Sequence, residues 1–280
     1  MNPFTATYRI PVSPLLPTPS PLEACPPWRG EGRGEGASAA QRNTLDVLTP
    51  DGPGPFPVVV IIHGGGWREG SNAAAHHHAR MLLPLGIASV MPNYRLTTTD
   101  PHPAQQDDIL AVLDWVGANA RDFGGDPMRL ALLGWSAGGH LVAQVGLLAT
   151  RLPLKNPAYR IRCLHPVCGV FDVAQWLRDC PQYAPEVNAL LGPSATASDA
   201  SPISHIHPDA PPFRLTHGTA DTVVPPNQST LLHDALQRAN IPVECLLAPN
   251  ERHTSLCTPR PSEPLGGMEG FSSFLKKHLL

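Results

Sequence analysis

The chain has 280 residues, of which 42% are hydrophobic and 15% are charged, and its formal net charge is −3. This composition suits a soluble globular protein with one full core, and the net charge gives no reason to expect nucleic acid or an anionic membrane as a partner. No apolar run approaches the roughly 18 residues that a membrane-spanning helix needs. We therefore expect neither a nucleic acid nor a membrane as a partner.

The N-terminal segment, residues 1–42, is a Pro- and Gly-rich lead-in to a single folded domain at 43–280. We expect an edge strand from Thr5 to Val12, after which closely spaced prolines prevent a helix or a central strand. The segment lacks a basic start followed by an apolar stretch, so no ordinary signal peptide is visible. A cytoplasmic location is the default expectation, and the sequence leaves secretion open.

Strand-like and helix-like segments alternate from residue 43 onward. The alternation predicts an α/β fold, in which a mostly parallel central sheet is covered by helices on both faces. The expected strands are 43–49, 58–62, 87–91, 129–133, 161–167, 212–216 and 243–248. The expected helices are 73–85, 103–121, 140–148, 228–239 and 270–280. Residues 171–206 interrupt the alternation and predict a small cap-like excursion above the carboxyl ends of the strands.

The central motif is Gly134-Trp135-Ser136-Ala137-Gly138, which lies between an expected strand and an expected helix. This is the setting in which G-x-S-x-G forms a nucleophile elbow. Gly134 and Gly138 flank the serine where a side chain would collide with a crossing strand or helix. Ser136 is thus the candidate nucleophile, and the N–H of Ala137 is a candidate donor to an oxyanion.

A second glycine-rich motif, His63-Gly64-Gly65-Gly66-Trp67, follows the β-branched strand at 58–62. Consecutive glycines let the backbone approach a ligand and turn its N–H groups outward. An H-G-G-G sequence at a strand end supplies the second half of an oxyanion hole in esterases and lipases. Gly65 and Gly66 are therefore further candidate donors.

The candidate acid and base are Asp221 and His253, because each lies in a loop after an expected strand and the order Ser, Asp, His is that of an α/β-hydrolase triad. Asp209 and Glu251 are alternatives for the acid, but only Asp221 directly follows a buried strand and a glycine-containing turn. His253 is preferred among thirteen histidines because it alone lies in a post-strand loop after the acid.

Other chemically suggestive residues have a structural interpretation. His76, His77 and His78 point in different directions on a helix, so we expect a solvated face and no metal site. Asp107 and Asp108 lie near a helix start, where they favour its dipole, and one of them is expected to pair with Arg95.

The six cysteines are scattered without a C-x-x-C pair, so metal and scaffold roles are both disfavoured. Cys163 and Cys168 are expected to be buried thiols, and a bridge involving Cys25, Cys180 or Cys257 is left open.

These motifs, together with 93–96, 103–108 and 217–221, resemble the carboxylesterase side of the α/β-hydrolase superfamily. The group that they match includes bifunctional feruloyl and acetyl-xylan esterases and lies next to the hormone-sensitive-lipase-like esterases. The resemblance implies oxyanion donors at Gly65, Gly66 and Ala137 and a pocket lined by Trp67, with Trp135 and Trp176 as further substrate contacts. The chain departs from the group after His253, where 254–259 replaces a glycine-like continuation.

The resulting prediction is a serine carboxylic-ester hydrolase that acts through an acyl-enzyme on short or compact acyl esters. It would need no metal and no cofactor, would bind a small-molecule ester and would be a monomer or homodimer. The alternatives are an arylformamidase, which shares a similar H-G-G-x-W loop and triad, and a catalytically silent binding protein on the same fold.

Overall fold

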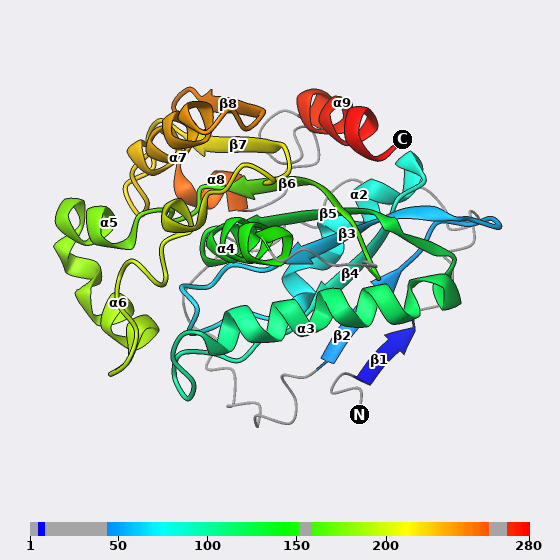
Figure 1. The fold of residues 1–280 in the computed structure, drawn as a ribbon, viewed down its shortest axis with the longest axis horizontal. Helices are drawn as coiled ribbons and strands as arrows, with labels where there is room; N and C mark the ends of the chain where they lie inside the picture. Colours follow the sequence, from blue (N-terminus) through cyan, green and yellow to red (C-terminus); the bar gives the residue numbers. More distant parts are fainter. Residues whose placement is uncertain (1–4, 9–43, 152–157, 258–267) are drawn as a thin grey trace, which may run out of the picture.

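The computed structural model describes residues 5–8, 44–151, 158–257 and 268–280, and these residues contain one mixed sheet of eight strands (Figure 1). The strands are β1 (Thr5–Tyr8), β2 (Thr44–Leu48), β3 (Phe56–Ile62), β4 (Ala88–Pro92), β5 (Gly125–Trp135), β6 (Ile161–Val167), β7 (Phe213–Gly218) and β8 (Val243–Ala248). Their order is β1-β2-β4-β3-β5-β6-β7-β8. Strands β2 and β4 are antiparallel, and the other neighbouring pairs are parallel.

The α-helices of the described residues are α2 (His76–Leu82), α3 (Ala104–Asn119), α4 (Ala137–Arg151), α5 (Val173–Asp179), α6 (Ala184–Leu191), α7 (Asn227–Arg238), α8 (His253–Cys257) and α9 (Met268–Leu279). Short 3-10 helices are η1 (Asn72–Ala75), η2 (Leu83–Leu85), η3 (Ala120–Phe123), η4 (Pro181–Tyr183) and η5 (Pro202–His205). The predicted alternation of strands and helices is therefore confirmed.

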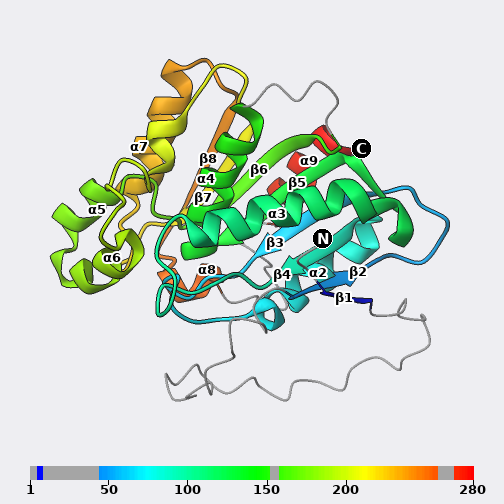
Figure 2. The ribbon, with the colours of Figure 1, turned by 60° about the horizontal axis from the view of Figure 1, so that its bottom comes forward.

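Helices cover both faces of the sheet, as Figures 1 and 2 show. In β3 successive side chains enter two different cores, because side chains alternate along a strand. Val58, Val60 and Ile62 pack with α3, α4 and α7, whereas Val59 and Ile61 pack with α2 and α9. This double burial explains why 58–62 is continuously β-branched in place of alternating with polar residues.

The predicted helix at 73–85 is divided into η1, α2 and η2. Pro84 lies inside the last segment, where it cannot donate the backbone hydrogen bond that a continuing α-helix requires. Gly86 ends the unit with a left-handed φ of 70°, as predicted for its C-terminal cap. The predicted ion pair is also present, since Arg95 contacts Asp108 at 2.8 Å.

The prediction that the three adjacent histidines form a solvated face is wrong for His78, which is 1% exposed. Its ring packs on Trp135 with a centroid separation of 4.6 Å. His76 instead turns toward Asp46 on β2, and His77 contacts His78 edge-on. Burial lowers the pKa of His78 to about 4, so its ring is neutral at pH 7. The three side chains do not converge on a common point.

The cap-like excursion contains α5 and α6, which lie side by side at one end of the molecule (Figures 1 and 2). Its large apolar side chains face inward. Trp176, Val187 and Leu190 are buried in the core next to α4, and Leu177 and Leu191 pack against that core. The excursion is therefore a packed extension of the domain and presents no free patch built from these five residues.

Two sequence predictions concern segments that are only partly described. Strand β1 occupies the first half of the expected edge strand, while Arg9 to Val12 and the rest of the lead-in lie outside the described residues. Cys163 and Cys168 are buried free thiols, as predicted, and Cys180 and Cys257 are also free. Cys25 lies outside the described residues.

Candidate active site

Ser136 occupies a tight turn between β5 and α4, with a φ of 54° that is unusual for a residue with a side chain. Its N–H donates to the carbonyl of Val167 at 2.9 Å, which fixes the turn against the end of β6. A Cβ at Gly138 would lie 2.1 Å from the Ile62 carbonyl oxygen, and one at Gly134 would lie 2.7 Å from the same atom. Both glycines are thus required by close packing, as the elbow motif predicts.

The structure brings Ser136, His253 and Asp221 into one hydrogen-bonded row. Nε2 of His253 lies 2.9 Å from the Ser136 hydroxyl oxygen, and Nδ1 of His253 lies 2.6 Å from Oδ2 of Asp221. With the ring proton on Nδ1, Ser136 donates to the imidazole and the imidazole donates to the carboxylate. These groups follow β5, β7 and β8, so residues distant in the sequence meet at one edge of the sheet.

The Asp221 side chain is fully buried and is held by four groups. Its Oδ1 accepts hydrogen bonds from the N–H groups of Val223 and Val224, each at 2.9 Å. Its Oδ2 accepts from His253 and lies 3.3 Å from Nε2 of His217. Burial alone would raise the pKa of Asp221, but the contacts with His217 and His253 and the backbone N–H bonds lower it well below its usual range. The carboxylate is therefore ionised at neutral pH.

Whereas His253 lowers the pKa of Asp221, Asp221 raises the pKa of His253. Burial lowers the pKa of His253, whereas the sulfur of Cys168 and the Asp221 carboxylate raise it, and the net pKa lies above the usual histidine value. Burial also raises the pKa of the Cys168 thiol well above its usual range. Because that thiol is neutral near pH 7, we assign the charge that acts on His253 to Asp221.

The two rivals for the acid do not reach the imidazole. Asp209 is exposed in the loop before β7. Glu251 contributes its backbone carbonyl, which accepts a hydrogen bond from Ala220 at 3.0 Å and helps to close the Asp221 turn. Asp221 alone among the three has a carboxylate within hydrogen-bond distance of His253.

The glycine loop after β3 forms a compact turn. The carbonyl of Gly65 accepts hydrogen bonds from Arg68 and Glu69 at 3.1 and 3.0 Å. Gly65 has a φ of 123°, and a Cβ there would lie 2.2 Å from the Glu69 carbonyl oxygen, so no other residue fits. Gly66 is also left-handed, with a φ of 58°. Ala137, the third predicted oxyanion donor, is the first residue of α4, where N–H groups lack partners within the helix.

The three tryptophans predicted to contact substrate are nearly buried. Trp67, Trp135 and Trp176 are 1%, 5% and 3% exposed. Trp67 packs edge-on against Trp176 at 5.9 Å, so these two lie together beside the glycine loop. Trp135 instead packs on the α2 side of the sheet. Their role as substrate contacts stays a prediction.

Two histidines that the sequence did not mark as site residues support this arrangement. Nε2 of His217 donates to the Val224 carbonyl at 2.8 Å and lies 3.3 Å from Asp221, so Nδ1 accepts from Ser229 at 2.7 Å. His140 accepts from the indole of Trp67 at 3.1 Å and donates to the Ala200 carbonyl at 2.7 Å. His217 begins the motif at 217–221 and His140 ends the one at 134–140, but neither motif specifies these long-range partners.

His253 differs from its prediction in one respect, because it begins the short helix α8 and does not lie in an irregular loop. The unusual continuation after His253 forms this helix through Cys257. Five residues are too few for a helical periodicity to be visible in the sequence. Residues 258–259 of that continuation lie outside the described part of the chain.

A mostly parallel sheet with a serine elbow after β5 and an acid and a histidine after β7 and β8 defines an α/β-hydrolase of the esterase type. The predicted fold class and the predicted resemblance are confirmed. More particularly, the chain belongs to the BD-FAE family, whose profile matches residues 45–236.

Similarity to individual proteins agrees with this assignment. The probable carboxylic ester hydrolase LipM of Mycobacterium tuberculosis is 32% identical over 75% of this chain and 50% of its own length. The kynurenine formamidase of Meyerozyma guilliermondii is 27% identical over 66% of this chain and 73% of its own. A carbohydrate esterase from gut microbiota has the same fold, with a TM-score of 0.72, 23% identity and coverage of 85% and 91% of the two chains. The chain spans about half the length of the first curated esterases that it matches.

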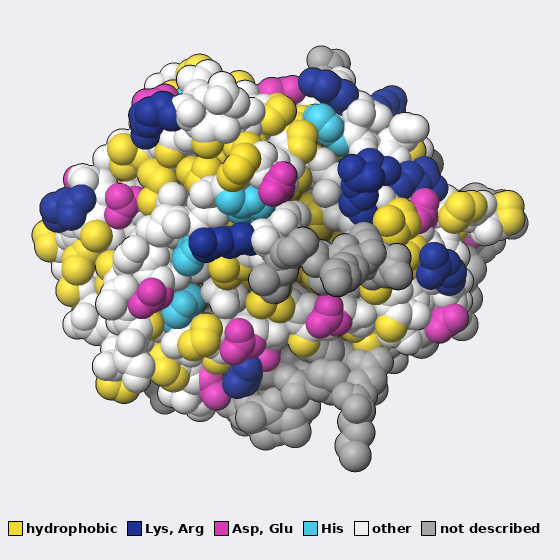
Figure 3. All heavy atoms as spheres, viewed as in Figure 1, with side chains coloured by type: hydrophobic (Ala, Val, Ile, Leu, Met, Phe, Trp, Pro, Cys, Tyr) yellow, Lys and Arg dark blue, Asp and Glu magenta, His cyan; other side chains and the backbone are white. Residues whose placement is uncertain are grey.

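On the face shown in Figure 3, acidic and basic side chains lie among neutral and hydrophobic ones, and several basic side chains lie near one another at the upper right of the view. Among the helices of the described residues, none combines the length and the apolar character needed to cross a bilayer.

Proposed function

We propose that the protein hydrolyses carboxylic esters of short or compact acyl groups through an acyl-enzyme on Ser136. The observation that carries this proposal is the continuous row from Ser136 through His253 to Asp221, with distances of 2.9 and 2.6 Å. The row supplies a nucleophile, a base and an orienting carboxylate, which together suffice for acyl transfer. The reaction requires no metal ion or organic cofactor.

In the acylation step, the Ser136 oxygen attacks the ester carbonyl while Nε2 of His253 takes the hydroxyl proton. Asp221 keeps the other ring proton on Nδ1 and stabilises the imidazolium that forms. The N–H groups of Ala137, Gly65 and Gly66 are the proposed donors to the developing oxyanion. The tetrahedral intermediate then expels the alcohol, which receives the proton from His253.

In the deacylation step, water replaces the alcohol. His253 takes a proton from this water as it attacks the acyl-enzyme carbonyl, and the same oxyanion donors stabilise the second tetrahedral intermediate. Collapse of that intermediate releases the acid, and His253 returns the proton to Ser136. Both half-reactions thus use one base in one position.

The proposed substrates include acetyl or feruloyl esters of carbohydrates, because the sequence motifs resemble the group of esterases with those activities. Substrate preference varies within one fold, so the acyl and alcohol groups must be measured. The most informative experiment is a panel of p-nitrophenyl esters, acetylated and feruloylated sugars, and N-formylkynurenine, combined with labelling of the purified protein by a fluorophosphonate.

Ester turnover with one equivalent of label on Ser136 is the expected result of that panel. Preferential cleavage of N-formylkynurenine would instead support the arylformamidase alternative, which the similarity to a kynurenine formamidase makes worth testing. Absence of both labelling and turnover in folded protein would favour the catalytically silent alternative.

We predict a preference for short acyl chains. The apolar side chains of α5 and α6 already pack into the core, and Trp67 is fixed by His140 and Trp176. An open apolar acyl tunnel would add about 0.8 kcal/mol of binding per buried methylene, so kcat/KM would rise with chain length. We expect a maximum between acetyl and butyryl and a decline by octanoyl, measured with p-nitrophenyl acetate through palmitate. A maximum at decanoyl or longer would contradict this prediction.

We also predict that hydrolysis increases with pH through a midpoint above the ordinary histidine pKa of about 6.5. The base must be neutral to accept a proton, and Asp221 stabilises its charged form, so a larger fraction of His253 is protonated at any given pH. Activity is therefore lost as pH falls through this raised pKa. Log kcat/KM against pH, measured with a non-ionising acetate ester, should show a slope of one on the acidic side. A midpoint below 6 in folded enzyme would contradict the prediction.

A further inference from the structure

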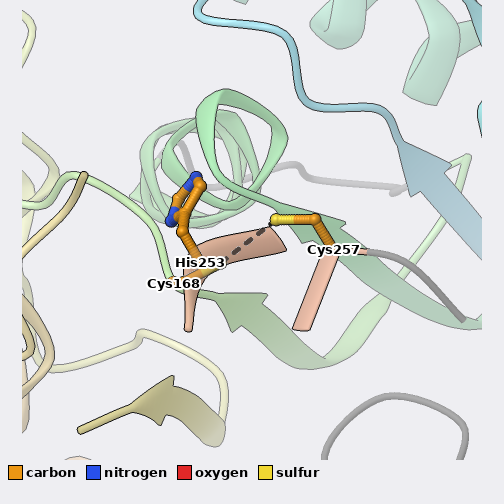
Figure 4. A group of neighbouring side chains, drawn as sticks. All are labelled: Cys168, His253 and Cys257. Atoms are coloured by element: carbon orange, nitrogen blue, oxygen red, sulfur yellow. Dashed lines mark hydrogen bonds between the residues drawn. The ribbon is translucent and has the colours of Figure 1, made fainter. Parts of the chain in front are cut away.

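Two thiols and an imidazole meet beside the Ser136–His253–Asp221 row (Figure 4). The sulfur atoms of Cys168 and Cys257 are 3.5 Å apart. One donor atom from each of Cys168, His253 and Cys257 lies within 4.8 Å of the other two. Cys257 follows His253 by four residues, so both lie on one face of α8, and Cys168 directly follows β6. The proposed ester hydrolysis uses neither thiol.

The spacing is close to that of a tetrahedral zinc site. With Zn–S distances of about 2.3 Å, two sulfur ligands of a tetrahedral ion are roughly 3.7 Å apart. The observed 3.5 Å differs from this value by a few tenths of an ångström. A sulfur and a nitrogen ligand are roughly 3.5 Å apart in the same geometry, so the sulfur–nitrogen separations, all within 4.8 Å, need to shorten by about 1.3 Å at most. Cys168 is buried, whereas His253 and Cys257 are half-buried, so small side-chain rotations of these two residues provide the movement.

The chemistry of the three donors selects the ion. Thiolate and imidazole ligands favour zinc and cadmium over magnesium and calcium, which prefer oxygen. The cysteines release their protons when they bind a metal, and two thiolates then balance the charge of a divalent ion. The zero net charge of the ion with its two thiolates suits a buried site, and Cys168 is fully buried. Cys257 is partly exposed and offers a route for entry.

We propose that Cys168, His253 and Cys257 form an inhibitory binding site for a thiophilic divalent cation such as Zn²⁺. Both nitrogens of His253 are already engaged, Nδ1 with Asp221 and Nε2 with Ser136. A metal bound at either nitrogen therefore breaks one of the two contacts and removes the base from the row. Three protein ligands leave the fourth position to water. The inhibition rests on the proposed function, whereas the binding does not.

Binding is tested first, without reference to activity. Reduced, metal-free full-length protein is titrated with Cd²⁺, and the ultraviolet charge-transfer band of the cadmium–thiolate bond is measured. The expected result is a band that saturates at one equivalent. Cys257→Ser should weaken binding at least about tenfold, because even loss of an outer-shell partner costs a metal site that much. The matched control is Cys245→Ser, which removes a half-buried thiol on β8 outside the cluster and should bind as the wild type does.

Absence of a saturable band in the wild type would overturn the proposal, as would cadmium binding that Cys257→Ser leaves as tight as in the wild type. Circular dichroism of each variant shows that it is folded. These outcomes are decided even if the protein hydrolyses no ester, so failure of the metal site and failure of the proposed function are distinguishable.

Inhibition is tested second, on the ester that the panel identifies. Zn²⁺ should inhibit the wild type and the Cys245→Ser variant, and a chelator should restore their activity. Cys257→Ser should keep its basal turnover and require at least about tenfold more Zn²⁺ for half inhibition. Cadmium-loaded wild-type protein with undiminished activity would show that His253 is not a ligand, and would overturn the proposed site.

Discussion

Ser136→Ala is expected to lower turnover of the best ester by about 10⁶-fold, since removal of a triad nucleophile costs about that much. The variant should fold, because alanine fits the same turn and the fixed N–H bond to Val167 does not involve the hydroxyl. Steady-state kinetics measure turnover, fluorophosphonate labelling measures the reactivity of residue 136, and circular dichroism measures folding. Ser204→Ala is the matched control and should remain active. Ser204 is exposed, and its hydroxyl accepts a hydrogen bond from Ser198.

Full activity in a Ser136→Ala preparation free of wild-type enzyme would contradict the acyl-enzyme mechanism. Loss of activity together with loss of helical signal would report unfolding instead. Labelling of the Ser204→Ala control, which keeps Ser136, shows that the probe reports on the intended serine.

His253→Ala is expected to be nearly as damaging as the serine change, and Asp221→Asn somewhat less damaging, with a loss of about 10⁴-fold. Removal of the base abolishes proton transfer, whereas the asparagine variant retains the imidazole but no longer favours the proton on Nδ1. In the structure, Oδ1 of Asp221 accepts hydrogen bonds from the N–H groups of Val223 and Val224. In Asp221→Asn the amide oxygen is expected to keep these bonds, which turns the NH₂ group toward His253, where an acceptor is needed. No other carboxylate of the described residues accepts a hydrogen bond from His253.

The controls for this prediction are Asp209→Asn and Glu251→Gln, both of which should leave kcat/KM within a few-fold of the wild type. Asp209 is exposed, and the part of Glu251 that closes the Asp221 turn is its backbone carbonyl. A larger loss in either control than in Asp221→Asn would show that the acid has been assigned wrongly.

The parts of the fold that depend on local pattern could be predicted from the sequence. The β-branched run before His63 indicates a doubly buried strand, and the glycines beside Ser136 indicate an elbow, because each requirement acts within a few residues. Strand β8 at 243–248 has the predicted boundaries. The order Ser136, Asp221, His253 then follows from the expected succession of parallel strands.

Features that depend on distant partners could not be predicted in this way. His78 on α2 is buried because Trp135, at the end of β5, covers it. In the short helix at 253–257, Leu256 packs into the core on the α2 and α9 side of the sheet. The meeting of Cys168 and Cys257 joins residues 89 positions apart, which no spacing rule connects. The hydrogen bond from His140 to Ala200 and the contact between His217 and Asp221 likewise require the folded sheet.

The proposed nucleophile, Ser136, and the proposed base, His253, follow strands that differ in burial. Strand β5, which leads to Ser136, lies inside the sheet, and its last six residues are buried. Strand β8, which leads to His253, is an edge strand with one buried residue. Amide groups at such an edge open by local fluctuation at a lower free energy than the centre. We expect mild denaturant to abolish ester turnover before global unfolding, with hydrogen exchange fast in β8 while β5 stays protected; one cooperative transition for both strands would contradict this. Loss of activity on heating would then follow local opening of the edge strand β8. Substitutions that stabilise β8 should therefore raise the inactivation temperature more than repacking the core does.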